Sequence, residues 1–301
     1  MSPFCAAVDW GTSSFRLWLL DGDGRVLAEG RGAEGMMAAR ETGFAAVLDQ
    51  HLGAAGAPAG LPVVICGMAG ARQGWKEAAY IDTPARLADL ARHAVRVEMP
   101  GRDVRILPGV AQRDAARPDV MRGEETQLLG LLAQGVASAL VCLPGTHSKW
   151  VRLRDGGVDS FSTFMTGEIF AALSAHTILK LSAEGEAAPD DPAFLAGVRE
   201  ASNNPATIAS QLFAIRAGPL LGFAPRGAAG LSGALIGLEL AGVRARHGDG
   251  GERGEVVLLS AGRLGELYRA ALDEMGFAVR AIDAEAAARA GLMRAAQAIW
   301  G

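Results

Sequence analysis

The feature that most constrains the fold is a short motif that occurs twice. The stretch VDWGTSSFRLWLLDG near the N-terminus contains Gly-Thr-x-Ser and then Asp-Gly, and so does LPGTHSKWVRLRDG in the middle of the chain. Gly11 and Gly145 are 134 positions apart, as are Asp21 and Asp155, so the stretches align without a gap. Each pattern predicts a strand, a tight turn, a second strand and a second turn. The repeat indicates two similar domains that each open with a three-stranded meander.

A simpler explanation is that Gly, Thr, Ser and Asp-Gly recur because hairpin turns need them. Length favours the duplication, since 301 residues at about 150 residues per domain give about two domains. Half of the residues are hydrophobic, which suffices for two cores. We therefore expect an α/β protein with an N-terminal domain over residues 1–115 and a C-terminal domain over residues 116–301.

Composition narrows the class of protein. The formal net charge of −4 argues against a nucleic-acid partner, which would require a basic face. The three cysteines, Cys5, Cys66 and Cys142, stand singly in apolar runs, as expected of buried thiols in a reducing compartment. The N-terminus has no signal-peptide pattern, and no run approaches the ~18 apolar residues of a membrane span. These features predict a cytoplasmic protein without a membrane partner.

The first Gly-Thr turn has the composition of a phosphate site. Gly11 leaves backbone N–H groups free for phosphate oxygens, and Thr12, Ser13 and Ser14 add hydroxyl donors. Asp9 ends the preceding strand, and a carboxylate beside bound phosphate is repelled unless a cation lies between them. Asp9 therefore predicts Mg²⁺, although a turn-capping aspartate would give the same pattern.

Two glycine patterns could suggest other nucleotide sites. Gly30-x-Gly32-x-x-Gly35 matches a dinucleotide fingerprint, but the helix that this fingerprint needs at its third glycine is not predicted, because helical periodicity resumes only near Phe44. Neither a G-x-x-x-x-G-K-[ST] loop nor the protein-kinase motifs occur, so another architecture must hold any nucleotide.

A predicted strand over residues 61–66 leads into the loop GMAGARQGWKEAAY. This loop crowds polar side chains at a strand's C-terminal end, where ligand sites of α/β folds lie. Arg72, Gln73, Trp75 and Lys76 would suit a small anionic ligand, the alternative being a solvated helix start. Residues 84–95 are then expected as a helix and residues 104–107 as the last strand of the first half.

The stretch MRGEETQLLGLL places a carboxylate pair, Glu124 and Glu125, at the head of a predicted amphipathic helix. Neighbouring residues lie about 100° apart around a helix, so both carboxylates cannot point at one reacting hydroxyl. Glu124, beside flexible Gly123 on the chain's entry to the helix, is predicted to be the catalytic carboxylate of the pair, and Glu125 to cap the helix or bridge domains. Both could also be solvated helix-start acids.

The remainder is mostly helical between residues 167 and 245, which predicts an insertion in the second domain that could act as a lid or as a homodimer surface. A strand over residues 255–259 and a helix from Leu264 flank the small-residue turn of Ser260, Ala261 and Gly262, where a flat ring could approach the backbone. Residues 278–282 and 284–300 close the chain as a strand and a helix. Of the five histidines only His147, in the second turn, is a functional candidate.

Taken together, VDWGTSSFRLWLLD, GMAGARQGWKEAAY, VMRGEETQLLG, LPGTHSKWV, FMTGE and NNPA resemble the 2-keto-3-deoxygalactonate kinases (2-dehydro-3-deoxygalactonokinases) of the actin-like ATPase and sugar-kinase superfamily, from one end of the chain to the other. The resemblance implies two duplicated actin-like (ribonuclease H-like) domains. It also implies ATP-dependent phosphorylation of the 6-hydroxyl of 2-dehydro-3-deoxy-D-galactonate, a sugar-acid substrate, in galactonate breakdown.

The resemblance also assigns roles to residues. It implies a first phosphate motif of Gly11, Thr12, Ser13, Ser14 and Arg16, a second of Gly145, Thr146, His147, Ser148 and Lys149, and an adenosine motif of Ser260, Ala261 and Gly262. It places Glu124 where related kinases carry the aspartate of Gly-Asp, and it implies a sugar-acid site of Arg72, Gln73, Trp75, Lys76 and Arg122. The Ser-Ala-Gly turn departs from the usual glycine-rich adenosine turn.

Phosphoryl transfer would then use both turns to hold the phosphates of ATP together with Mg²⁺, and domain closure would exclude water. Three alternatives remain open at this stage. These are a kinase for another keto-deoxy acid or sugar, a non-catalytic sugar sensor of the same fold, and a nicotinamide oxidoreductase that uses Gly30 to Gly35.

Overall fold

The structure is a computed structural model that describes residues 2–248 and 254–301. The chain forms two compact units. The first unit comprises the chain up to Ala137 together with residues 153–160 and 284–301, and the second comprises residues 138–152 and 161–283. The units thus divide at Ala137, not at the expected boundary after residue 115, and the C-terminal helix belongs to the first unit.

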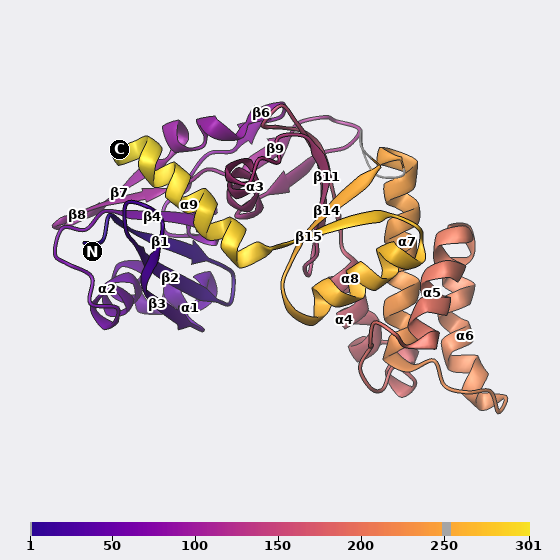
Figure 1. The fold of residues 1–301 in the computed structure, drawn as a ribbon. Helices are drawn as coiled ribbons and strands as arrows, with labels where there is room; N and C mark the ends of the chain where they lie inside the picture. The colour runs from indigo at the N-terminus through magenta and orange to yellow at the C-terminus, as the bar shows by residue number, and fades with distance from the viewer. Residues whose placement is uncertain (1, 249–253) are drawn as a thin grey trace. The chain divides into compact units, whose positions relative to one another are not determined.

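The first unit is built on one mixed sheet in the order β3-β2-β1-β4-β8-β7 (Figure 1). Its strands are β1 (Cys5–Trp10), β2 (Phe15–Leu20), β3 (Val26–Gly32), β4 (Val63–Gly67), β7 (Val95–Met99) and β8 (Arg102–Ile106). The antiparallel strands β1, β2 and β3 form the predicted meander, and β4 pairs with β1 in parallel.

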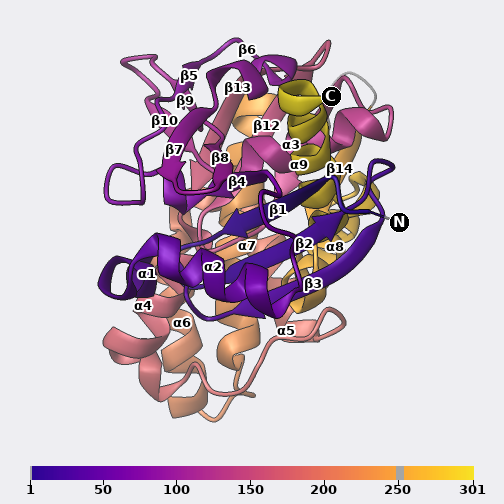
Figure 2. The same ribbon diagram turned by 90° about the vertical axis from the view of Figure 1, so that its left-hand side faces the viewer.

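Helices cover both faces of this sheet, and the central strand β1 is therefore buried on both sides. Ala6, Val8 and Trp10 point to one face, where they pack with α1 (Met36–Thr42) and α2 (Phe44–Ala54), which Figure 2 shows beside the strands. The opposite face packs against α9 (Ala284–Trp300), which lies along α3 (Glu124–Ala133). Asp9 alternates with Val8 and Trp10 and therefore points toward the face of α9.

A small sheet in the order β10-β9-β5 completes the first unit and was not anticipated from the sequence. It contains β5 (Ile81–Asp82), β9 (Val110–Gln112) and β10 (Asp119–Met121). The expected helix over residues 84–95 is wrong. Residues 85–86 form β6 and pair with Gly157 and Val158, and two 3-10 turns, Leu87–Asp89 and Ala91–His93, follow. Backbone groups that pair in a sheet are not available for a helix, so tertiary pairing overrides the helical composition.

The second unit repeats the same plan. β11 (Ala139–Leu143), β12 (Ser148–Arg154) and β13 (Gly157–Phe164) are consecutive neighbours in a sheet that continues through β14 (Glu255–Ser260) to β15 (Ala278–Asp283). Asp155 lies in the turn between β12 and β13, as Asp21 lies in the turn between β2 and β3. The predicted α/β duplication is therefore confirmed.

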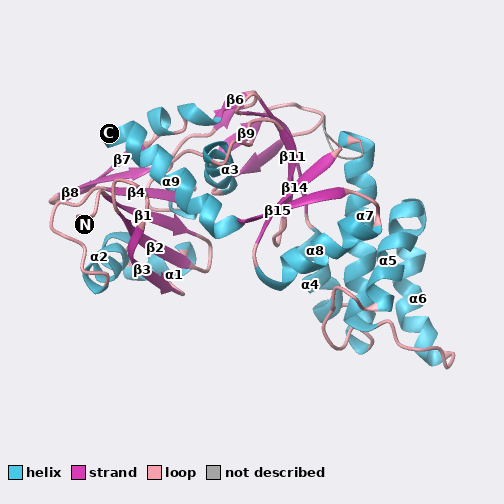
Figure 3. Ribbon diagram, in the orientation of Figure 1, coloured by secondary structure: helices cyan, strands magenta, loops and turns pink. Residues whose placement is uncertain are grey.

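The described part of the second unit contains five α-helices. They are α4 (Thr166–His176), α5 (Pro192–Asn203), α6 (Ile208–Leu220), α7 (Gly227–His247) and α8 (Gly262–Glu274). Figure 3 shows α5, α6 and α7 side by side in the expected helical segment. Among residues 2–248 and 254–301, α7 alone has the length and apolar composition of a membrane span, but 67% of its most apolar stretch is buried, as in a core helix.

Candidate functional site

The first Gly-Thr turn joins β1 to β2 and exposes its hydroxyls. Gly11 N donates to Ser14 O at 2.9 Å, which closes the turn, while the side chains of Thr12, Ser13 and Ser14 are exposed. The start of α1 packs on the turn, since Met36 N donates to Gly11 O at 2.9 Å. A tight turn with exposed hydroxyls on a rigid support suits an anion.

Gly35 makes that packing possible. It caps the N-terminus of α1, and a Cβ atom there would lie 2.5 Å from the backbone of Ser13. The expectation that helical structure resumes only near Phe44 is therefore wrong, because α1 begins directly after Gly35. Gly30 and Gly32 nevertheless lie within β3, so the first two glycines are not in a loop between strand and helix as a dinucleotide fingerprint requires.

The second Gly-Thr turn, between β11 and β12, has the same support. Glu168 N in α4 donates to Thr146 O at 3.1 Å, and a Cβ atom on Gly167 would lie 2.8 Å from the Cα atom of Thr146. Thr146 and His147 are exposed, and His147 Nε2 lies 2.5 Å from Glu168 Oε2. In both units, therefore, a helix start with a close-packed glycine holds a Gly-Thr turn open to solvent.

Two residues expected at the second phosphate site point inward instead. Ser148 is fully buried and its hydroxyl donates to Glu239 Oε2 at 2.8 Å, while Lys149 is 6% exposed. Ser148 and Lys149 are adjacent and point to opposite faces of the sheet, and both are buried because the start of β12 is covered on both faces. The sequence analysis missed Glu239, although a single acid inside the apolar helix α7 is a recognisable signal.

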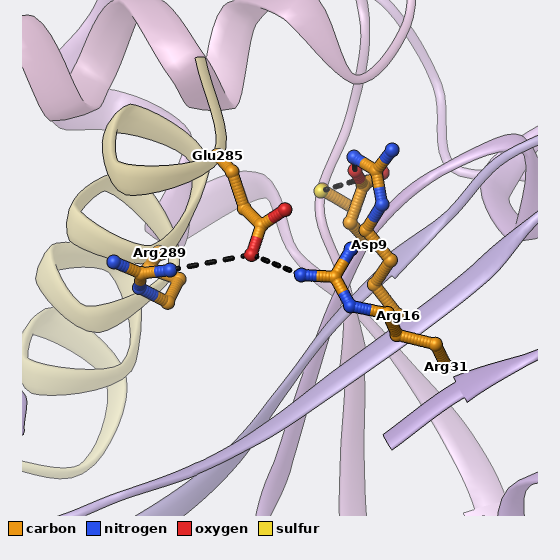
Figure 4. Close-up of polar contacts among 6 residues, drawn as sticks. Asp9, Arg16, Arg31, Glu285 and Arg289 are labelled. Atoms are coloured by element: carbon orange, nitrogen blue, oxygen red, sulfur yellow. Dashed lines mark hydrogen bonds and ion pairs between the residues drawn. The ribbon is translucent and has the colours of Figure 1, made fainter. Parts of the chain in front are cut away.

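Asp9 lies at the end of β1 between two neighbours on adjacent strands. Its Oδ2 atom is 3.6 Å from Arg16 Nη1 on β2, and Cys66 Sγ on β4 lies 3.8 Å from Oδ1 (Figure 4). Burial raises the pKa of Asp9 above its ordinary value, the Arg16 guanidinium opposes the rise, and the negative charge of Glu124 adds to it. Asp9 and Glu124 therefore influence each other electrostatically within the first unit.

A second charged group lies on the same face. Glu285, at the start of α9, lies 2.7 Å from Arg31 Nη2 and 3.4 Å from Arg289 Nη1 (Figure 4). These contacts tie the start of α9 to β3. They also place a further carboxylate within electrostatic reach of Asp9, whose pKa Glu285 raises slightly.

The start of α3 separates the two adjacent carboxylates. Gly123 has a φ of 106°, a conformation that side chains rarely adopt, and a Cβ atom there would lie 3.5 Å from Gly67 Cα. Glu125 is 0% exposed and accepts from Gly123 N at 2.7 and 3.0 Å. Glu124 is half-buried, and its Oε2 atom accepts from Arg122 N at 3.0 Å. Glu125 thus caps the helix from the core, and Glu124 remains on the side of Asp9.

Arg122 lies beneath this helix start. Its Nη2 atom donates to Ala78 O at 2.8 Å and its Cζ atom lies 4.4 Å from the ring centre of Tyr80. Within residues 2–248 and 254–301, Nε and Nη1 of Arg122 are buried without a hydrogen-bond partner. Unsatisfied buried donors are costly, so an anionic group at this guanidinium would be stabilised.

The loop after β4 presents only part of the expected set. Arg72 and Gln73 are exposed, and Lys76 Nζ donates to Arg96 O at 2.9 Å. Trp75 instead packs into the core of the first unit, where its ring stacks on Phe44 with centres 6.0 Å apart. A partly buried aromatic ring next to two exposed polar residues indicates that Trp75 shapes the loop.

Two cavities flank the start of α8 in the second unit. One, of about 640 Å³, is lined by Ser260, Ala261 and Gly262. The other, of about 450 Å³, is bordered by Gly145 and Thr146 of the second turn and by Arg263 and Leu267 of α8. Both volumes fall in the range of small-molecule sites, and the second adjoins a phosphate-type turn.

Within the described residues, 2–248 and 254–301, no group of three or more His, Cys, Asp or Glu side chains could hold a metal ion. A single carboxylate beside a phosphate-type turn still fits Mg²⁺, because proteins usually hold this ion through one or two carboxylates together with substrate phosphates. Asp9 beside the first turn is such a carboxylate.

Comparison with known proteins identifies the family. Residues 9–295 match the family of 2-keto-3-deoxy-galactonokinases. The chain belongs to this family.

Two curated relatives agree with that membership. A protein of Rhizobium meliloti (strain 1021), named as a probable 2-dehydro-3-deoxygalactonokinase, is 58% identical over 99% of this chain and 98% of its own. The 2-dehydro-3-deoxygalactonokinase of Escherichia coli (strain K12) is 35% identical over 97% of each chain.

A solved structure gives the same result for the fold. The crystal structure of a candidate 2-dehydro-3-deoxygalactonokinase from Sinorhizobium meliloti has 56% sequence identity and a TM-score of 0.94, and it covers 99% of each chain. The expected fold of two duplicated actin-like units is thereby confirmed.

The buried carboxylate of Glu125 predicts a pH dependence of stability. Burial, aided by the charge of Glu124, raises its pKa from 4.5 to about 8, so the folded chain keeps a proton that the unfolded chain releases above pH 4.5. The contribution of Glu125 to the free energy of unfolding is therefore greatest below pH 4.5 and falls by up to ~1.4 kcal/mol per pH unit until pH reaches about 8.

We expect Glu125→Gln to gain stability relative to the wild type as pH rises from 5 to 8, as measured by urea unfolding. Glu77→Gln, which removes an exposed carboxylate of the same unit, is the control and should show no such trend. A stability difference between Glu125→Gln and wild type that is the same at every pH would contradict the protonated state of Glu125.

Proposed function

We propose that the chain transfers the γ-phosphoryl group of ATP to the 6-hydroxyl of 2-dehydro-3-deoxy-D-galactonate, giving ADP and 2-dehydro-3-deoxy-6-phosphogalactonate in galactonate catabolism. The observation that carries this proposal is family membership over nearly the whole chain, with relatives of that name at 58% and 35% identity. A sugar-acid kinase also accounts for the two supported Gly-Thr turns. We place the enzyme in the cytoplasm, with a small-molecule partner.

Each Gly-Thr turn would bind phosphate oxygens of ATP through backbone N–H groups and hydroxyls. The first offers Thr12, Ser13 and Ser14, and the second offers Thr146 with His147 beside it. The cavity of about 450 Å³ next to the second turn would take the rest of the nucleotide. Phosphoryl transfer needs positioning and charge neutralisation more than covalent chemistry, and rigidly supported donors supply both.

Glu124 is the proposed general base. It is half-buried, its backbone neighbour Gly123 holds the helix start close to β4, and its charge acts on Asp9. The carboxylate would orient the acceptor hydroxyl and accept its proton as the bond to phosphorus forms. Glu125 is fully buried and its carboxylate accepts from Gly123 N, so it is not offered to a substrate hydroxyl.

Asp9 would hold Mg²⁺, directly or through water. When bound, the ion neutralises charge that develops on the phosphate oxygens. Asp9 itself contributes a carboxylate already oriented by Arg16, and the raised pKa of Asp9 indicates that its charged form lacks a sufficient counter-charge in the protein alone. A cation at this position would supply that counter-charge.

On the sugar-acid side we propose Arg72, Gln73 and Arg122 as ligands, with Trp75 shaping the loop and Lys76 contributing if it exchanges its bond to Arg96 O. A cation that holds the substrate carboxylate away from the reacting hydroxyl binds ground and transition states equally, so it sets KM more than kcat.

The function is tested by measuring ADP release with a panel of keto-deoxy sugar acids that includes both C4 epimers. We expect the highest kcat/KM with 2-dehydro-3-deoxy-D-galactonate. A higher value with another acid would favour a kinase of different specificity, and ligand binding without ADP release would favour a non-catalytic sensor. An increase in Tm on addition of NAD would instead favour the nicotinamide oxidoreductase.

Glu124→Gln should lower kcat by roughly 10² to 10⁴ with little change in KM, because the variant retains shape but loses the proton acceptor. Glu125→Gln is the matched control, one residue further along the same helix, and should change stability more than kcat. Near-normal kcat in Glu124→Gln together with a collapse in Glu125→Gln would reverse the two roles.

Asp9→Asn should leave the fold intact and cut turnover severely, with a higher Mg²⁺ concentration needed for half-maximal rate. The reason is the loss of a charged metal ligand. Asp23→Asn, at an exposed turn of the same meander, should behave as wild type in the same Mg²⁺ titration. Normal turnover of Asp9→Asn at limiting Mg²⁺ would remove Asp9 from the metal site.

A further inference from the structure

A buried carboxylate in the second unit connects the elements that form the nucleotide side of the site. Glu239 of α7 is 2% exposed, and four side chains donate to it. Ser148 Oγ and Tyr268 OH donate to Oε2 at 2.8 Å each, Trp150 Nε1 donates to Oε1 at 2.7 Å, and Thr166 Oγ1 also donates to Oε2.

These donors come from three different elements, and each matters to the second Gly-Thr turn. Ser148 is the first residue after the turn, and Trp150 follows on the same face of β12. Thr166 opens α4, whose next two residues, Gly167 and Glu168, pack on and hydrogen-bond to the turn. The carboxylate therefore holds both the exit of the turn and the helix start that supports it.

The fourth donor extends the network to the cavity beside the turn. Tyr268 lies on α8, and its side chain lines the cavity of about 450 Å³ together with Thr166, Gly145 and Thr146. The two carboxylate oxygens of Glu239 therefore hold both the residues next to the turn and Tyr268 in the cavity wall. Its position behind these residues keeps it from touching a ligand.

We propose that Glu239 is a positioning residue for nucleotide binding, which sets the second Gly-Thr turn, the start of α4 and Tyr268 in one fixed arrangement. The inference rests on the proposed function, because it assumes that this turn and cavity take the phosphates and the rest of ATP. A carboxylate is suited to this task because it only accepts, and one group can therefore satisfy several converging donors.

The chemistry of the donors makes a specific demand. The indole N–H of Trp150 can only donate, so an oxygen atom must face it. In Glu239→Gln the amide oxygen would have to face Trp150, and the NH₂ group would then meet three hydroxyls that all donate in the native arrangement. Reversal of the amide would place two donors against each other at Trp150. In the first orientation the two amide hydrogens can serve at most two of the three hydroxyls, which would have to rotate to accept them, and in the second the Trp150 N–H loses its acceptor.

Thr166→Val tests the link to the turn with little change in volume, and Thr166→Ser restores the hydroxyl. We expect kcat/KM for ATP to fall about 10-fold in Thr166→Val and about 10²-fold in Glu239→Gln, since displacements of about 1 Å from changes outside the reacting groups can cost about 10²-fold. KM for the sugar acid should stay within about 2-fold, and Thr166→Ser should recover most of the ATP dependence.

Val243→Ala is the control for general destabilisation. Val243 is fully buried on α7, one turn beyond Glu239, and packs in the core of the second unit. This variant should lower Tm without a change in KM for ATP. Binding of a non-hydrolysable ATP analogue, measured by calorimetry, gives a readout that does not depend on the sugar acid.

The inference is wrong if Thr166→Val binds the analogue as tightly as wild type and retains its kcat/KM for ATP, whatever its Tm. It is also wrong if Val243→Ala weakens ATP binding as much as Thr166→Val does. Comparison of Thr166→Val with Thr166→Ser tests the positioning role of Glu239 even if Glu239→Gln fails to fold. Failure of the proposed function would be seen separately, as absence of sugar-acid-dependent ADP release by the wild type.

Discussion

The arrangement of carboxylates in the first unit is the constraint on which the rest of the site depends. The charge of Glu124 raises the pKa of both Asp9 and Glu125, and Arg16 is the ion-pair partner of Asp9. Like charges in a partly buried site cannot all be carried without a compensating cation or a proton. The raised pKa of Glu125 shows how one of them is relieved, because a buried proton removes its charge. Asp9 keeps a raised pKa despite Arg16, because burial and the charge of Glu124 both disfavour its charged form.

Because the two units repeat the same plan, each Gly-Thr turn is supported in the same way by a helix start of its own unit, but the residues around the two turns differ. In each unit a helix start contributes a backbone N–H to a turn carbonyl, and a glycine allows the close approach. The turn of the first unit follows Asp9, whereas the turn of the second unit is followed by Ser148, which donates a hydrogen bond to the buried Glu239. The first copy of the motif therefore has a carboxylate beside it, whereas the second is joined through Ser148 to a buried network that also holds Tyr268 in a cavity wall.

The sequence predicted the duplication, the strands around both turns and the helix that begins at Glu124, because these follow from local spacing and turn chemistry. The general-base role of Glu124 stays a prediction. Placements that depend on distant partners were not accessible. Residues 85–86 pair with β13, Trp75 stacks on Phe44, and Ser148 donates to Glu239, 91 positions later in the sequence. The expected domain boundary differed from the division of the units for the same reason, since the return of α9 to the first unit is decided by packing rather than by sequence position.

Packing of α9 also reaches the proposed base. α9 lies against α3, and the contact requires glycine on both helices. A Cβ atom on Gly130 would overlap the carbonyl of Ala287, and one on Gly291 would overlap the carbonyl of Thr126. Thr126 is two residues from Glu124, so the close approach of the two helices constrains the start of α3, where the proposed base lies. The same α9 brings Glu285 to Arg31. The helix α9 carries no proposed ligand, yet its packing on α3 constrains where Glu124 lies. Its Glu285 also contributes to the raised pKa of Asp9.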